Sequence, residues 1–521
     1  MFCVAGKSFG SNLKTVVVSG NVHIPFAVTT DLGCAGPSKV AIGSLPDEVL
    51  LEIFTFYVEG ANYPGWITLV HVCRGWRFIV FASPLRLDLR LHVGSIAHVR
   101  ELLDIWPALP IEIYPLYYVG PGQETSKVME NVIAALEHRD RVCDITVHYF
   151  PVPGQKLERF LEMTQYPFPA LTCLRLWKWL DEGEEAPVIP DAFLGGSAPL
   201  LQSLRLAHVA FPALPKLLLS ANDLVRLDLS HIAHAGYISP EVMVTLLSSM
   251  TRLRYFCLTF NSPSSRPSRT SRRPPPMIRT ALPALTRFCF RGVSEYVEDL
   301  VARIRAPLLH DIHISFFNRL IFDIPQLLQF ANRVERSNRL NAAVSFSGYG
   351  ASVELSSGTD ERLLLEISCS QADWQLSSVA QFCGMSLHPI PTSENLKVTI
   401  NSDNSRHFGR FDIEHSQWEE LLYPFINVKN LYLDEDVGLH AAIALQGLVG
   451  ESLMQMLPAL QSLFIKGLQP SGPTWDAAES FVVARHRFGC PITIHSWGED
   501  SEMEYSSHVS VQELDVEWYN D

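Results

Sequence analysis

A short apolar motif, Leu-x-x-Leu-x-Leu, recurs along most of this chain and strongly limits what the chain can fold into. Its copies, with occasional Val, Ile or Phe in place of Leu, begin at Leu171, Leu201, Leu224, Leu253, Leu285, Leu309, Val428 and Leu460. The alternation at the end of each copy is typical of a strand, and stretches between copies, such as 242–247 and 297–304, have helical spacing. One strand-plus-helix unit cannot bury its apolar face alone, so neighbouring units are expected to stack into a solenoid.

The repeat is irregular. Successive copies begin 30, 23, 29, 32, 24, 119 and 32 residues apart. The gap of 119 residues predicts about three degenerate repeats, with strands near 344–346 and 396–400, and strands near 111–113 and 145–147 extend the series toward the N-terminus. The Asn or Cys expected after the last Leu occurs once, at Asn261, so a regular asparagine ladder is not expected. The sequence predicts an α/β protein with an irregular leucine-rich-repeat solenoid, and the alternative is an unrelated β-rich α/β fold.

The residues before the repeats predict two or three short helices. Ser44-Leu-Pro-Asp-Glu48 has the composition of a helix start, and the next ten residues are apolar on two neighbouring helical faces. A second helical stretch covers 66–81, with Gly75 as the expected break and Ser83-Pro84 as its end. A unit of about 40 residues is marginal alone. Its excess apolar surface is therefore expected either to cap the following domain or to contact a partner.

Two segments of this region match a known signature. Leu45-Pro-Asp-Glu-Val-Leu-Leu-Glu-Ile-Phe54 and Val72-Cys-Arg-Gly-Trp76 resemble the opening and closing halves of the F-box. Later stretches at 373–383, 428–433 and 467–473 are similar to the F-box-like proteins that are abundant in basidiomycete fungi.

The resemblance implies a three-helix F-box that docks on the Skp adaptor of a cullin–RING ubiquitin ligase, with the repeats presenting an unidentified protein substrate. It thereby implies a non-catalytic, substrate-recognition role in ubiquitin-dependent protein degradation. The residues that match the motif, and that would form or support the docking surface, are Leu45, Pro46, Ile53, Phe54, Val72, Cys73 and Trp76. Trp76 has a core position as its alternative. Gly75 replaces the usual Arg or Lys of the family, which keeps open a second hypothesis: an F-box-like scaffold that binds a partner outside any ligase.

The expected domain organisation follows from these patterns. A poorly ordered extension covers 1–40, the F-box-like helices 41–85 and the repeats 86–497. Within the repeats, the basic Ser- and Pro-rich segment 261–279 is expected to be a disordered insert. Residues 498–521 contain eight acids and no Lys or Arg, which is typical of a solvated tail.

Composition narrows the function further. The formal net charge of −14 disfavours nucleic-acid binding, because phosphate contacts need a basic face. No apolar run reaches the 18 residues of a membrane span, so the expectation is an intracellular protein in the cytoplasm, the nucleus or both.

The sequence also lacks the short motifs of common cofactor and metal sites. The 10 cysteines form no C-x-x-C pair and are expected to be buried free thiols. His148, His208, His313, His407 and His415 have no Cys or carboxylate partner at ligand spacing, and each is expected to flank a strand or lie on the surface. No nucleotide-binding or hydrolase motif is present, so no cofactor or metal is expected. An enzyme with catalytic residues far apart in sequence stays the third hypothesis.

Overall fold

The computed structural model forms two compact units, one of residues 1–185 and 189–203, the other of 186–188 and 204–521. It describes residues 42, 45–60, 65–93, 99–105, 107–114, 124–148, 155–177, 186–267, 279–317, 324–332, 341–357, 361–369, 372–384, 393–400, 415–448 and 450–497. The expected extension 1–40 and the acidic tail 498–521 lie outside these residues.

The first unit begins with three helices, α1 (Asp47–Glu59), α2 (Trp66–Val70) and α3 (Arg74–Ala82). The first hydrogen bonds of helix α1 are accepted by Pro46. The amides of Val49 and Leu50 donate to its backbone oxygen at 3.0 and 3.1 Å. Pro46 is thus the N-cap, and its side chain makes no cap bond. The acids Asp47 and Glu48 occupy the positive end of the helix dipole, as the sequence predicts.

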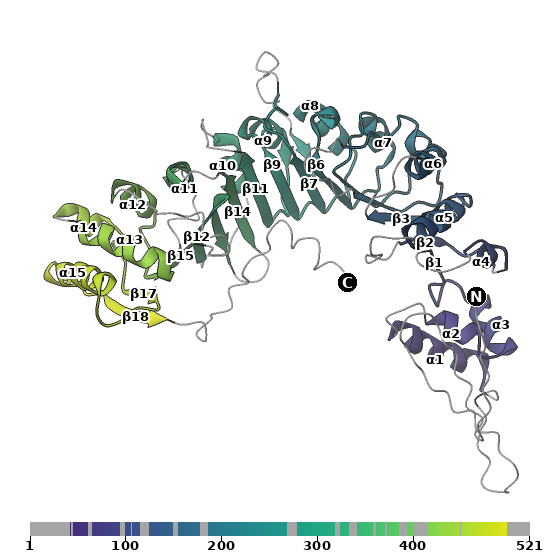
Figure 1. Ribbon diagram of the computed structural model, residues 1–521, viewed down its shortest axis with the longest axis horizontal. Coiled ribbons are helices and arrows are strands. Elements are labelled where there is room, and N and C mark those ends of the chain that lie inside the picture. The colour runs from purple at the N-terminus through teal and green to yellow at the C-terminus, as the bar shows by residue number, and fades with distance from the viewer. Residues whose placement is uncertain are drawn as a thin grey trace, which may run out of the picture. The chain divides into compact units, whose positions relative to one another are not determined.

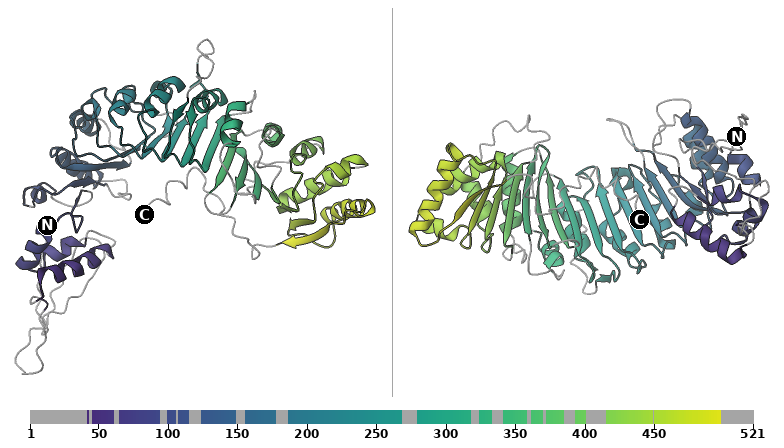
Figure 2. Two further views of the ribbon diagram at one scale, coloured as in Figure 1. Left: turned by 180° about the vertical axis from the view of Figure 1, so that it is seen from behind. Right: turned by 90° about the horizontal axis from the view of Figure 1, so that it is seen from below.

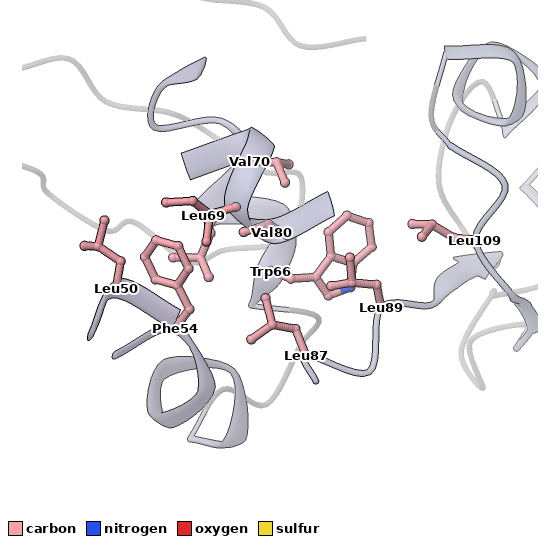
Figure 3. Packing of buried hydrophobic residues seen from close by; sticks show 10 residues of the cluster. Leu50, Phe54, Trp66, Leu69, Val70, Val80, Leu87, Leu89 and Leu109 are labelled. Atoms are coloured by element: carbon pink, nitrogen blue, oxygen red, sulfur yellow. The ribbon is translucent and has the colours of Figure 1, made fainter. Parts of the chain in front are cut away.

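These helices share one hydrophobic core (Figure 3). Leu50 and Phe54 of α1 pack with Trp66 and Leu69 of α2, and the cluster continues to Leu87 after α3. The Trp66 side chain is 1% exposed. A side chain of this size contributes about 1.5–3 kcal/mol or more by its burial. The core of the three helices therefore continues into the chain that follows them, through Leu89 to Leu109.

The rest of the first unit alternates strands and helices. Its elements are β1 (Leu91–Val93), α4 (Val99–Ile105), β2 (Ile111–Ile113), α5 (Glu124–Leu136), β3 (Val142–His148), α6 (Gln155–Met163) and β4 (Cys173–Trp177). The strands are parallel and pair in chain order. The strands predicted at 111–113 and 145–147 are present as β2 and part of β3. Strand β5 (Ser203–Ala207) lies where the chain passes into the second unit.

The second unit continues the alternation. Its first part contains α7 (Leu214–Ser220), β6 (Arg226–Ile232), α8 (Pro240–Leu247), β7 (Tyr255–Phe260), β8 (Thr280–Ala281), β9 (Arg287–Gly292), α9 (Ser294–Val301), β10 (Ile304–Arg305), β11 (Asp311–Phe317) and α10 (Pro325–Asn332). Its second part contains β12 (Asn341–Ser347), β13 (Gly350–Ser356), β14 (Arg362–Ser368), α11 (Ala372–Gly384), β15 (Asn395–Ile400), α12 (His415–Leu422), β16 (Asn430–Leu433), α13 (Glu435–Gln446), α14 (Glu451–Gln455), β17 (Ser462–Lys466), α15 (Pro473–Arg487) and β18 (Thr493–Trp497).

Every copy of the Leu-x-x-Leu-x-Leu motif ends in a strand, which confirms the repeat as a structural unit. In the second unit, helices cover one face of the strands (Figure 1). Phe256 of β7 contacts Phe288 of β9, which contacts Phe330 of α10, with ring centroids 5.7 and 5.9 Å apart. The apolar alternate residues of each strand thus face the helices. This is a leucine-rich-repeat-like arrangement of strand plus helix, built by stacking.

The prediction for the long gap was wrong in one respect. It anticipated three strand–helix repeats, but β12, β13 and β14 form an antiparallel meander. The order of strands is β11-β14-β13-β12-β15, so the meander is inserted in reverse. The two-residue turn Gly348-Tyr349 explains why β12 and β13 are antiparallel. A turn of this length joins antiparallel neighbours, whereas a parallel pair needs a long crossover. At Gly350 a Cβ would lie 2.2 Å from the Ile367 carbonyl oxygen, so only glycine fits there.

The structure describes the first part of the predicted insert 261–279. Residues 261–267 are placed, and Ser265 is buried with its hydroxyl 3.3 Å from Nδ1 of His234. The prediction of disorder was therefore wrong for this stretch, and residues 268–278 lie outside the description. Within the described part of the chain, no helix has the length and apolarity to cross a bilayer.

Candidate functional site

Helix α1 exposes a second apolar face. Leu50 and Phe54 are buried, but Val49, Ile53 and Phe56 on the neighbouring face are 43%, 41% and 73% exposed. The spacing i, i+4, i+7 places these three side chains in one row, which we call the α1 outer face. Exposed apolar rows on a helix that already has a core are typical of interaction sites.

The seven residues predicted from the F-box signature fall into three groups. Pro46, Ile53, Val72 and Cys73 are exposed; Leu45 and Trp76 are half-buried against the core of α1–α3; Phe54 is fully buried. Phe54 and Trp76 contact each other, with ring centroids 4.7 Å apart. The structure therefore gives Phe54 and Trp76 supporting positions beneath the surface, whereas Ile53 and Val72 are available to a partner.

The junction between α2 and α3 differs from the expected break at Gly75. The helices separate at 71–73, and Cys73 caps α3 through its sulfur, which accepts a hydrogen bond from the Trp76 amide at 3.4 Å. Gly75 lies inside the first turn of α3. A Cβ at Gly75 would meet the Cys73 sulfur at 3.8 Å, an ordinary contact. The glycine weakens the helix by its freedom in the unfolded chain, not by any need for space.

Signature matching missed several exposed apolar residues of α1 and α3. Val49 and Phe56 complete the α1 outer face, and Phe78 of α3 is 72% exposed. The signal for Val49 and Phe56 was present in the sequence, since they share a helical face with Ile53. A signature alone could not separate that face from the Leu50–Phe54 face, because both are apolar. Only the packing of α2 and α3 decides which of the two is covered.

The second surface of interest is the face of the repeat sheet opposite the helices, which we call the open face (Figure 2). Its polar residues pair across strands. The amide of Asn395 donates to Asn341 at 2.9 Å, and that of Asn430 donates to Asn395 at 2.8 Å. A short asparagine ladder therefore exists, although at the start of the strands rather than at the position where a regular repeat would have it.

The same open face carries thiols and a half-buried His–Glu pair. Cys257, Cys289 and His313 are register partners on β7, β9 and β11. Nε2 of His313 lies 2.8 Å from Oε2 of Glu366 on β14. The sequence predicted that His313 flanks a strand or lies on the surface, but it lies half-buried inside β11. Its neighbours Cys289 and Glu366 are 24 and 53 residues away in sequence, and only strand pairing brings them together.

The cysteines are free, as expected, but not all are buried. Cys173, Cys257, Cys369 and Cys383 are buried, Cys143, Cys289 and Cys490 are partly exposed, and Cys73 is exposed. Cys3 and Cys34 lie outside the described residues. Among the residues that the structure describes, no group of three or more His, Cys, Asp or Glu is placed to hold a metal ion.

Comparison with known proteins adds little to this geometry. No family model matches the chain, and no curated protein matches it. One similar solved structure is the leucine-rich repeat-containing protein LegL7 from Legionella pneumophila, with 14% identity over 65% of this chain and 96% of that one, and a TM-score of 0.25. At this TM-score the similarity carries no argument, and the repeat architecture is derived from the strands and helices themselves.

Proposed function

We propose that this chain is a substrate-recognition adaptor of a Skp–cullin–F-box ubiquitin ligase. In this proposal α1–α3 dock on the Skp adaptor and the repeats hold a target protein, so that the chain promotes ubiquitin-dependent degradation without catalysing a reaction. The observation that carries the proposal is the α1 outer face, an exposed apolar row on a helix whose neighbouring face is already packed. Its location within the segment that resembles the F-box opening supports the choice of partner.

The expected contact is centred on Ile53 and Val72. Both side chains are branched and apolar, and both are substantially exposed, at 41% and 50%. Burial of such side chains in an interface gives a large share of its binding free energy, and truncation of a central one costs about 2 kcal/mol. Phe54 and Trp76 hold α1 against α3 and would act only indirectly.

The test is a pull-down and a titration of the purified Skp adaptor with the full-length chain. Ile53→Glu and Val72→Glu are each expected to weaken binding by roughly 30-fold or more, because a charge replaces an apolar anchor. Leu219→Glu is the matched control, since Leu219 of α7 is also an exposed apolar residue, at 58%. Unchanged far-ultraviolet circular dichroism of the variants shows that they fold.

The second candidate is an F-box-like scaffold that uses the same helices outside any ligase, and the feature that favours it is Gly75 in α3. If the folded wild-type chain fails to bind the adaptor at micromolar concentration, the ligase role is refuted and the scaffold takes its place. If binding survives both charge substitutions, the adaptor is bound elsewhere and the α1 outer face is not its site.

A further inference from the structure

The open face brings two thiols, an imidazole and a carboxylate into one cluster, which we call the β7–β14 thiol cluster: Cys257, Cys289, His313 and Glu366. Register pairing places Cys289 between Cys257 and His313 on consecutive parallel strands. Neighbouring parallel strands lie about 4.8 Å apart, so each side chain lies beside the next. The arrangement is independent of α1–α3 and of any adaptor.

Strand pairing sets the order of the cluster. Nε2 of His313 lies 2.8 Å from Oε2 of Glu366, and Cys289 is the register partner of both His313 and Cys257. On the far side, the sulfur of Cys257 lies 4.0 Å from the hydroxyl of Ser230. A carboxylate that orients an imidazole next to a thiol is the arrangement by which proteins activate a sulfur nucleophile.

The charges favour a thiolate on Cys289. A hydrogen bond from the Cys257 thiol, and a second from His313, outweigh burial and lower the pKa of Cys289 to about 6. Burial disfavours the protonated imidazole, but its bonds to Cys289 and Glu366 raise the pKa of His313 to about 10. The hydrogen bond to Cys289 and burial raise the pKa of Cys257, which therefore stays a thiol.

Access also differs between the two sulfurs. Cys289 is partly exposed on the open face, whereas Cys257 is only 4% exposed. A small reagent in solution therefore meets Cys289 first. The two residues are register partners, and their Cα separation of about 4.8 Å falls within the range of roughly 4.4–6.8 Å that a disulfide requires.

We propose that Cys289 is a modification site for hydroperoxides, with Cys257 as the resolving thiol. The Cys289 thiolate attacks the terminal oxygen of the hydroperoxide; an S–O bond forms, the O–O bond breaks, and the departing alkoxide or hydroxide takes a proton from His313. The sulfur loses two electrons and becomes a sulfenic acid. The Cys257 thiol then attacks that sulfur, the S–O bond breaks, a disulfide forms and one water leaves. A thiol reductant restores the starting state.

The first experiment uses the reduced full-length chain and iodoacetamide at pH 6 and pH 8, with modified peptides quantified by mass spectrometry. Cys289 is expected to react about twofold faster at pH 8, because half of it is already thiolate at pH 6. Cys143 in β3 is the internal control: it is also partly exposed, and burial raises its pKa to about 11. Its rate is expected to rise about 100-fold.

The second experiment adds one equivalent of hydrogen peroxide at pH 7. The wild type is expected to yield a Cys257–Cys289 disulfide, and Cys257→Ser a sulfenic acid on Cys289 that dimedone traps. His313→Gln is expected to increase the rise in Cys289 alkylation between pH 6 and pH 8 above the twofold of the wild type, because one of the two groups that lower its pKa is removed. Circular dichroism checks that the variant folds.

The alkylation of Cys289 at pH 6 and pH 8 is measured on the wild-type chain, so it tests the proposal even if a variant does not fold. A rise of about 100-fold for Cys289, equal to that of Cys143, would overturn the proposal. The proposal would also be overturned if peroxide oxidised Cys289 no faster than Cys143. A stable sulfenic acid in the wild type, without the disulfide, would remove Cys257 from the role of resolving thiol. None of these outcomes depends on adaptor binding.

Discussion

Phe56 in α1 and Phe288 in β9 are both phenylalanines, but one faces solvent and the other is buried. Phe56 is 73% exposed, whereas Phe288 is 1% exposed and packs between Phe256 and Phe330. In the three-helix unit, one apolar face of α1 packs into the core and a second apolar face stays exposed. The repeat sheet places its aliphatic side chains toward the helices, and its open face mixes polar residues with stacked rings such as Tyr432 and Phe464. Excess apolar surface is thus concentrated on the small unit, where a partner is expected.

The largest expected effect tests this contrast directly. Phe288→Ala should lower the free energy of unfolding by about 3–5 kcal/mol, because it leaves a cavity in a packed core. Phe56→Ala should change it by less than about 0.5 kcal/mol, because the side chain is largely in water already. Urea unfolding of the two variants measures both values. Equal losses would show that the α1 outer face is structural rather than available to a partner.

An intermediate effect concerns the open face. Asn395→Ala removes the middle of the asparagine ladder and leaves Asn341 and Asn430 without their shared partner. The expected cost is about 1–2 kcal/mol, since half-buried polar groups lose hydrogen bonds. Thermal and urea unfolding beside Lys397→Ala, a neighbouring substitution on the same strand and face, provides the comparison. An unchanged midpoint for Asn395→Ala would mean that the ladder contributes nothing to stability.

The smallest effect sharpens the description of the helical unit. Gly75→Ala should stabilise the protein by about 0.5 kcal/mol, because alanine loses less backbone freedom on folding and its Cβ meets only an ordinary contact. The change is measured by differential scanning calorimetry. A loss of stability would indicate that the glycine is needed for the conformation of α3. It would also contradict the helix start at which the Cys73 sulfur caps α3.

The sequence determined the local elements of this protein, since periodicity and turn residues act over a few positions. It predicted the strands of all the Leu-x-x-Leu-x-Leu copies, the helix at 242–247 and the end of the N-terminal helices at Ser83. The helix predicted at 297–304 is present as part of α9, but Ile304 lies in β10 instead. It also identified Ile53 and Val72 as candidates for a partner surface. The predictions of strands and helices held because each depends on neighbours within about ten residues. The role of Ile53 and Val72 stays a prediction.

Tertiary structure alone decided how distant segments pair. The reversed order of β12, β13 and β14 follows from a hairpin turn whose effect on the sheet is not local. Which face of α1 is covered depends on the packing of α2 and α3. The β7–β14 thiol cluster depends on three strand pairings that bring together residues from 257 to 366. Contacts between residues so far apart in sequence leave no periodic trace in it, because they are set by the stacking of whole repeats.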